Sequence, residues 1–92
     1  MSEYIEVETT FTDDPDVIVI STNLTLAEHG EEIYRSIEDM EEGTAVAQTL
    51  ARVEGIDSLR IYEKNLEITR NPRVDWHNIV ADVNSALKDF FL

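Results

Sequence analysis

The second half of the chain carries the clearest pattern of apolar and polar positions. Val46, Leu50 and Val53 recur at i, i+4 and i+7, which places them on one stripe of a helix. Gly55 follows at a point where a helix C-terminus takes a positive φ, a conformation that costs glycine nothing sterically. We therefore predict an amphipathic helix that begins near Ala45 and stops before Gly55.

An alternation of period two follows this helix and predicts a β-hairpin. A two-residue loop at Glu63-Lys64 gives two apolar cross-strand pairs, Ile61 with Leu66 and Leu59 with Ile68. A three-residue loop ending at Asn65 would instead pair Ile61 with Glu67 and waste the apolar face. Glu-Lys is not a favoured type I′ turn, so local chemistry and packing disagree here. We expect packing to decide, with the two-residue loop.

A third apolar stripe predicts a helix at the C-terminal end. Asn71-Pro72 ends the hairpin, and Asp75 is a candidate N-cap for the helix. The stripe consists of Trp76, Ile79, Val80, Val83, Ala86, Leu87, Phe90 and Phe91. We expect its aromatic residues to join the core; an outward Phe91 or Leu92 would offer a docking surface.

The front of the chain predicts a second hairpin. Tyr4 to Phe11 alternates as a half-buried strand does, with the apolar side formed by Ile5, Val7, Thr9 and Phe11. Val17 to Ile20 is a β-branched run that suits a more central strand. Between them lies a turn cluster that contains Asp13, Asp14, Pro15 and Asp16.

Residues 24–43 leave two interpretations open. Ile33, Ile37 and Met40 fit helical spacing, yet Gly30 comes just before them and most residues between are acidic. Glu32 to Ser36 fits an edge strand instead, with residues 38–43 as a connector. We favour the strand, because carboxylates on an edge strand also discourage edge-to-edge aggregation.

Together these elements predict the α+β class. We expect a small antiparallel sheet of about four or five strands in two hairpins, with two amphipathic helices packed on one face. A chain of 92 residues has the size of one domain, so residues 1–92 are predicted to fold as a single unit.

This order of elements resembles the N-terminal domain of Nfu/NifU-type iron–sulfur scaffold proteins. Three features match: LARVEGI at Leu50 to Ile56, an I-x-x-x-x-L-x-I hairpin at Ile61 to Ile68, and Asp75-Trp76 opening the last helix. Two loops depart. The family's frequent T-P-N-P-N turn reads T-D-D-P-D at 12–16, and the second hairpin has E-K-N at 63–65 where relatives often carry Asp-Phe. The resemblance covers nearly the whole chain, most firmly from Ala45 onward.

The resemblance implies a pathway and a kind of role. Full-length members of the family hold their cluster with a Cys-x-x-Cys pair in a separate C-terminal domain, whereas this chain has no cysteine. The implied function is a non-enzymatic accessory or protein–protein interaction module in iron–sulfur cluster assembly or delivery, without a cofactor of its own. Its implied partners are assembly components. The alternative is an acidic adaptor of the same fold that serves an unrelated basic partner.

Loops at hairpin tips are where partners usually bind. The two departing loops therefore give the predicted partner-binding residues, which are Asp13, Asp14, Asp16, Glu63, Lys64 and Asn65.

Charge narrows the class of partner. Twenty acidic residues against seven basic ones give a net charge of −13. This charge argues against nucleic acid and against an anionic membrane surface, because both require a basic footprint. It is expected either to steer the protein toward a basic partner or to act generically on solubility, as in a high-salt cytoplasm. No apolar run approaches a membrane span and the N-terminus lacks a basic, apolar signal segment, so the predicted location is the cytoplasm.

Catalytic and metal-binding patterns are not found. The acidic clusters do not match the spacing of a calcium loop, and His29 and His77 are too scattered to form a closed site. Serines lack a nucleophile-elbow context, and three glycines cannot build a phosphate-binding loop. We predict no enzyme activity, and no catalytic, cofactor-binding or metal-binding residue.

Overall fold

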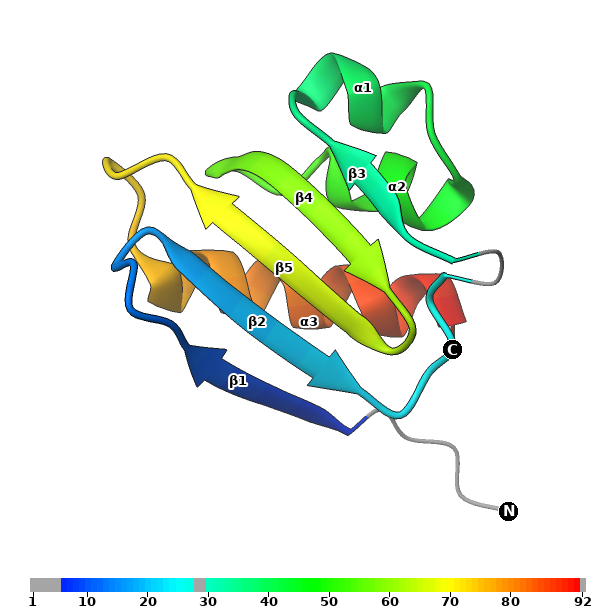
Figure 1. The fold of residues 1–92 in the computed structure, drawn as a ribbon, viewed down its shortest axis with the longest axis horizontal. Coiled ribbons are helices and arrows are strands. Elements are labelled where there is room, and N and C mark those ends of the chain that lie inside the picture. Colours follow the sequence, from blue (N-terminus) through cyan, green and yellow to red (C-terminus); the bar gives the residue numbers. More distant parts are fainter. Residues whose placement is uncertain (1–5, 28–29, 92) are drawn as a thin grey trace.

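A five-stranded antiparallel sheet forms the frame of the protein in a computed structural model, which describes residues 6–27 and 30–91 (Figure 1). The strands are β1 (Val7–Phe11), β2 (Val17–Thr22), β3 (Glu32–Tyr34), β4 (Ile56–Tyr62) and β5 (Asn65–Arg70). Their order across the sheet is β1-β2-β5-β4-β3, so β1 and β3 are the two edges. The two hairpins, β1-β2 and β4-β5, therefore pair with each other through β2 and β5. In the sequence they are separated by β3, α1 and α2.

Helices cover one face of this sheet. They are α1 (Ile37–Glu41), α2 (Ala45–Leu50) and α3 (Trp76–Phe91). Figure 1 shows α3 running behind the central strands, with α1 and α2 gathered near β3. The predicted α+β class is confirmed, and α1 is a short helix in addition to the two predicted ones.

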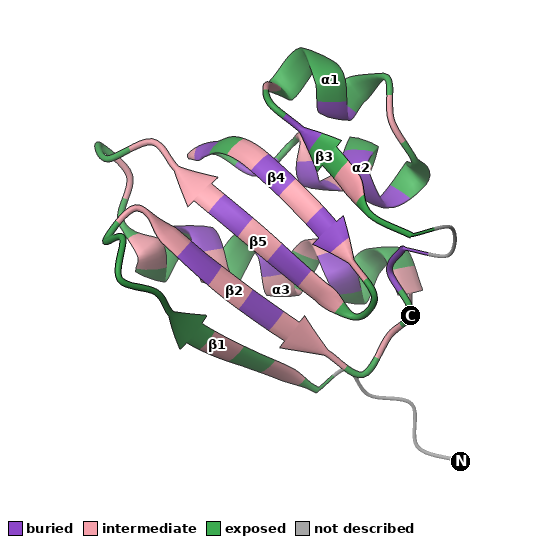
Figure 2. Ribbon diagram, viewed as in Figure 1, coloured by how far each residue is buried: buried purple, intermediate pink, exposed green. Residues whose placement is uncertain are grey.

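Alternating side chains explain why only one face is covered. The six side chains at the centre of the covered face are each at most 2% exposed, and these are Ile18, Ile20, Leu59, Ile61, Leu66 and Ile68. Figure 2 shows the resulting alternation of buried and partly buried residues along β2 and β5. We call the other side, which no described helix covers, the open face.

The second hairpin has the predicted register. Ile61 lies opposite Leu66 and Leu59 opposite Ile68, across a two-residue turn. Glu63 accordingly takes the left-handed conformation, with φ of 53°. Tertiary hydrogen bonds help to hold this unfavourable turn, because its carbonyls accept from N–H groups at the end of β2 and in the loop that follows β2. Packing and these bonds together override the local preference of Glu-Lys.

The ambiguous segment contains both a strand and a helix. Glu32–Tyr34 pairs with β4 as the predicted edge strand. The predicted connector at 38–43 is wrong for its first part, because α1 forms there. Ser36 starts this helix, since its Oγ accepts a hydrogen bond from the Asp39 backbone N–H at 3.2 Å. Of the residues that fitted helical spacing, only Met40 is buried, because Ile33 lies on β3 and both Ile33 and Ile37 are exposed.

The helix α2 ends earlier than predicted. It stops at Leu50, and Val53 reaches the core through a turn in which its N–H donates to the Leu50 carbonyl at 3.0 Å. Gly55 does take a positive φ, of +102°. Gly55 uses this φ in the tight turn that leads into β4, and it is not the residue that directly follows the helix as predicted. Its carbonyl accepts a hydrogen bond from the Asn71 N–H at 2.7 Å.

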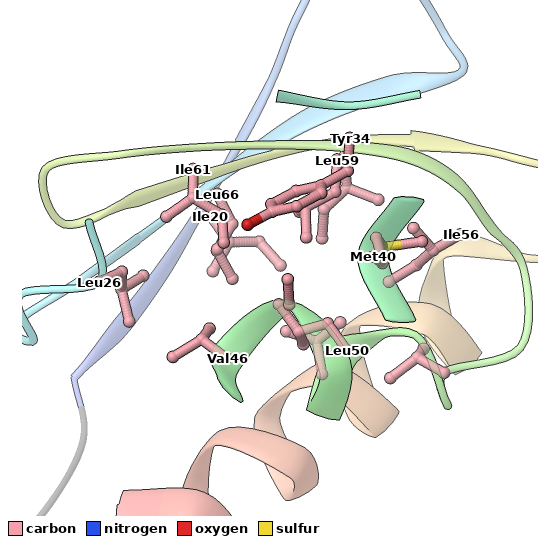
Figure 3. Packing of buried hydrophobic residues seen from close by; sticks show 14 of the residues in the cluster. Ile20, Leu26, Tyr34, Met40, Val46, Leu50, Ile56, Leu59, Ile61 and Leu66 are labelled. Carbon is pink, nitrogen blue, oxygen red and sulfur yellow. The ribbon is translucent and has the colours of Figure 1, made fainter. Parts of the chain in front are cut away.

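The core lies between the sheet and the helices (Figure 3). Val46 and Leu50 on α2 point toward the sheet, and Leu26, from the loop after β2, lies at one end of the cluster. Met40 lies at the other end beside Ile56. The loop and the short helix α1 therefore supply core residues as the regular elements do.

Two predicted core positions are wrong. Phe11 is 72% exposed, because β1 is an edge strand and the groove between Phe11 and α3 is not filled by other described side chains. Phe90 is 41% exposed, whereas Phe91 is partly buried and packs against the core, with the two rings in edge-to-face contact at 4.8 Å. The predictions for Tyr4, Ile5, His29 and Leu92 lie outside the described residues.

Candidate functional site

The turn between β1 and β2 holds three of the predicted partner-binding residues. The Asp14 Oδ1 accepts a hydrogen bond from the Asp16 N–H at 2.9 Å, and the Thr12 hydroxyl donates to the Val17 carbonyl at 2.8 Å. Asp13 and Asp14 are exposed, and Asp16 is partly buried. The turn is thus ordered by its own polar groups and presents two carboxylates to solvent.

Trp76 and Arg70 fasten this turn to the start of α3. The indole Nε1–H of Trp76 donates to the Pro15 carbonyl at 2.8 Å. The Arg70 Nε lies 3.1 Å from the Asp16 Oδ1, and its guanidinium lies over the Trp76 ring, 5.2 Å from the centroid. Trp76 was predicted as a core residue; it is partly buried and packs against the core, and its indole also connects α3 to the turn. The available signal was its indole N–H, which needs an acceptor when it is buried.

The backbone of the second predicted loop, at residues 63–65, stabilises the segment that follows β2. The Glu63 carbonyl accepts from the N–H groups of Leu26 and Ala27, at 2.9 and 3.2 Å, and the Lys64 carbonyl accepts from the Thr22 N–H at 2.9 Å. These bonds hold the loop that brings Leu26 to the core. The side chains of Glu63 and Lys64 remain exposed, and Asn65 is partly buried.

The structure does not bring the six predicted residues together. Strand β2 runs between the two loops: Val17 at its start lies opposite Thr69, and Ser21 near its end lies opposite Asn65. Figure 1 shows the two turns at opposite ends of the sheet, separated by about 20 Å for a strand of this length. They are two separate surfaces, and one small ligand cannot contact both.

An apolar groove that sequence reasoning missed begins at the first of these turns. It has a volume of about 500 Å³ and is lined by Thr9 and Phe11 of β1 and by Trp76, His77, Val80, Ala81 and Asn84 of α3. We call it the β1–α3 groove. The signal for it was Phe11, a large apolar residue placed on the inward side of a strand that turned out to be an edge.

Charged groups elsewhere form a small network on the open face. Arg60 binds Glu31 and lies 3.2 Å from Glu67, and its guanidinium lies 4.5 Å from the centroid of the Tyr62 ring. Hydrogen bonds to Glu31 and then Glu67 raise the pKa of Arg60, which stays charged.

A buried hydroxyl marks the β3 edge of the core. Burial, and then its hydrogen bond to Glu32, raises the pKa of the Tyr34 hydroxyl above its usual value. The same oxygen accepts from the Thr44 N–H at 3.3 Å. These bonds fix the ring beside the start of α2 and suggest no chemistry.

We expect the melting temperature to rise as sodium chloride increases from near zero to about 0.5 M. Twenty acids repel one another, and the ion pairs within the described ranges engage only Arg60 and Arg70. Screening should therefore relieve more repulsion than it removes attraction. Thermal melts followed by circular dichroism measure this. Arg60→Gln is the control: its deficit in melting temperature should shrink as salt increases. A melting temperature that falls with salt would contradict the expectation.

No three carboxylate or histidine side chains in residues 6–27 and 30–91 converge closely enough to hold a metal ion. His77 is exposed near the start of α3. Iron–sulfur clusters are held mainly by cysteine thiolates, and the sequence contains none, so this donor set does not fit a cluster.

Comparison with known protein families identifies the family of this chain. The sequence profile of the family described as "Scaffold protein Nfu/NifU N terminal" matches residues 6–92. The chain belongs to the Nfu/NifU N-terminal family. A search of curated proteins found no match to this family member.

Solved structures share the fold of this Nfu/NifU N-terminal domain. A NifU-like protein from Saccharomyces cerevisiae is 18% identical, with a TM-score of 0.77 over 97% of this chain and 82% of that one. Protein SAV1430 from Staphylococcus aureus is 13% identical, with a TM-score of 0.72 over 89% of this chain and 98% of that one. SeR13 from Staphylococcus epidermidis is 14% identical, with a TM-score of 0.59 over 92% and 98% of the two chains. At these identities the likeness shows the fold.

No helix in the part of the chain that the structure describes combines the length and the apolar character that crossing a membrane demands.

Proposed function

We propose that this Nfu/NifU N-terminal domain is a non-enzymatic accessory or protein-interaction module in iron–sulfur cluster assembly or delivery. The observation that carries the proposal is the family match over residues 6–92, whose description names a scaffold protein. The absence of cysteine means that the chain itself supplies no thiolate for a cluster. Its contribution would then be to bind another protein that carries, builds or receives the cluster.

Surface features support a role in binding proteins. Phe11 is exposed beside an apolar groove, and a net charge of −13 favours fast association with a basic partner. The partner-binding residues that we propose remain Asp13, Asp14, Asp16, Glu63, Lys64 and Asn65. The cytoplasmic location stays a prediction.

An acidic adaptor for an unrelated basic partner is the second candidate. It is favoured by the two loops that depart from the family pattern, at 12–16 and 63–65. Binding of this kind would depend strongly on charge, so its affinity should fall steeply as salt increases.

Affinity capture from an extract of the source organism tests both candidates. Tagged protein is used as bait at several salt concentrations, and bound proteins are identified by mass spectrometry. The proposal expects repeated enrichment of cluster-assembly components. Reproducible capture of other basic proteins, lost steeply with salt, selects the adaptor. Repeated failure to recover assembly components would overturn the proposed function.

A matched pair of variants shows whether the first loop takes part. Asp13→Asn with Asp14→Asn removes two charges at the β1–β2 turn, and Glu41→Gln with Glu42→Gln removes two exposed charges at the end of α1. Only the first pair should weaken capture if the turn contacts the partner. Equal effects would indicate that overall charge alone matters.

A further inference from the structure

We propose that the β1–α3 groove and the free edge of β1 together bind an extended, basic and apolar segment of a partner protein, which joins the sheet as an added strand. The inference rests on the proposed role as an interaction module and names its docking surface. Three features of the described residues carry it: an uncovered apolar surface, an unpaired strand edge, and exposed carboxylates at one end.

The apolar surface is continuous across β1 and α3. Phe11 is the most exposed large apolar side chain of the described chain, at 72%, and it lies over the groove rather than alone on the surface. Val80 and Ala81 line the helix side, and Trp76 lies at the end fastened to the β1–β2 turn. Apolar side chains of a bound segment would remove this surface from water, which is the main favourable term in association.

The edge of β1 offers backbone hydrogen bonds beside this surface. In an antiparallel pair, every second residue of a strand directs its N–H and C=O away from the paired strand. The edge strand β1 therefore has backbone N–H and C=O groups on the side that faces away from β2. An added strand would use them, and its alternate side chains would fall on the same face as Thr9 and Phe11, into the groove. The other edge, β3, is only three residues long, and Glu31 beside it is held by Arg60.

Charge selects the chemistry of the segment. Asp13 and Asp14 are exposed at the end of the groove where Trp76 meets Pro15, whereas Asp16 already binds Arg70. Glu8 lies opposite Ser21, on the open face of β1. Lysine or arginine side chains on the segment would meet these carboxylates. A second copy of this chain, with the same net charge of −13, would be repelled.

One polar group in the groove lacks a partner. The side-chain oxygen of Asn84 is buried without a hydrogen bond in the part of the chain that the structure describes. A buried acceptor of this kind is costly, and rotation of the amide toward the groove would let an N–H of a bound segment satisfy it.

The test uses a peptide of defined chemistry. The probe is a capped peptide of about ten residues, a usual strand length, that alternates valine with lysine. Binding is followed by the fluorescence of Trp76, the one tryptophan of the chain, and by chemical-shift mapping on ¹⁵N-labelled protein. We expect saturable binding, with the largest shifts in residues 7–11 and 76–84. A peptide with glutamate in place of lysine, and one with a central proline, should each bind at least about tenfold more weakly.

Protein variants locate the site. Phe11→Ser removes the exposed ring, and Ala81→Arg places a bulky cation in the groove at an exposed helix position that arginine suits. Each should raise the Kd at least about tenfold. The control is Ile33→Ser on the opposite edge strand, where an apolar side chain is 56% exposed, and it should leave the Kd within about twofold.

Several results would overturn the inference. These are the absence of binding by the valine–lysine peptide, shifts that map to β3 or the open face, a Kd unchanged by both groove variants, or concentration-dependent dimerisation through β1. The last would show that a second copy occupies the groove. The two proposals fail separately: peptide binding at the groove without capture of assembly components would retain the docking surface and remove the pathway.

Discussion

Replacing Ile68 by alanine is expected to lower the free energy of unfolding by about 2–5 kcal/mol. Ile68 is fully buried on β5, opposite Ile18 on one side and Leu59 on the other, so its loss opens a cavity at the middle of the sheet. Leu50→Ala on α2, also fully buried, should fall in the same range. Urea denaturation followed by circular dichroism measures the change.

The control for these core variants is Ile33→Ala. This side chain is 56% exposed, so its truncation should cost about 0.5 kcal/mol or less. A loss below about 1 kcal/mol for Ile68→Ala would show that the core is packed differently from the description above.

The second large effect is expected at Gly55. A Cβ at this position would lie 2.7 Å from the Val74 Cγ1 and 3.0 Å from the Ile79 Cδ1, and the φ of +102° is one that side chains rarely adopt. Backbone strain of about 1–3 kcal/mol and overpacking of a similar size should together make Gly55→Ala roughly 2–6 kcal/mol less stable. The same urea titration measures it.

Gly30 offers a matched control for the backbone part of this effect. Its φ is +103°, yet a Cβ there would meet no atom of the described residues within 4 Å. Gly30→Ala should therefore show strain alone, and Gly55→Ala should exceed it by at least about 1 kcal/mol. Equal losses for the two variants would argue against close packing of Val74 and Ile79 on Gly55.

Sequence reasoning succeeded where a local pattern is sufficient. The second hairpin is the clearest case, because of the two loop lengths compared only the two-residue loop places Ile61 and Ile68 on the same face, and a one-residue slip would turn the apolar side chains outward. The positive φ of Gly55 was likewise readable, since glycine alone adopts it without strain. Both depend on residues near one another in the chain.

Sequence reasoning failed where the burial of a residue depends on elements that are far away in the sequence. Alternation shows that Phe11 points inward, but whether anything covers it depends on how far α3 extends beneath β1. The helix α1 was missed for another reason: five residues give a weak periodic signal, and the decisive feature is the Ser36 cap.

In the candidate site, too, local features could be predicted and the contacts between distant elements could not. Composition identified two polar hairpin turns, and both are exposed tips of the sheet. Their separation, and the groove beside one of them, follow from the strand order β1-β2-β5-β4-β3, which no single segment encodes. The hydrogen bond from Trp76 to Pro15 joins residues that are 61 positions apart, so it likewise depends on the tertiary fold and not on one segment.

The pairing of β2 with β5 has a consequence for the order of events during synthesis. Arg70 reaches back 54 residues to Asp16, and β5 is the inner neighbour of β2, so the first hairpin has no sheet to join until β5 has left the ribosome. Long-range pairing of this sort slows folding and favours all-or-none assembly. The β1–α3 groove is lined by residues between 9 and 84, so it cannot form until the chain has been synthesised through α3. A partner that reads this groove would distinguish finished molecules from nascent ones.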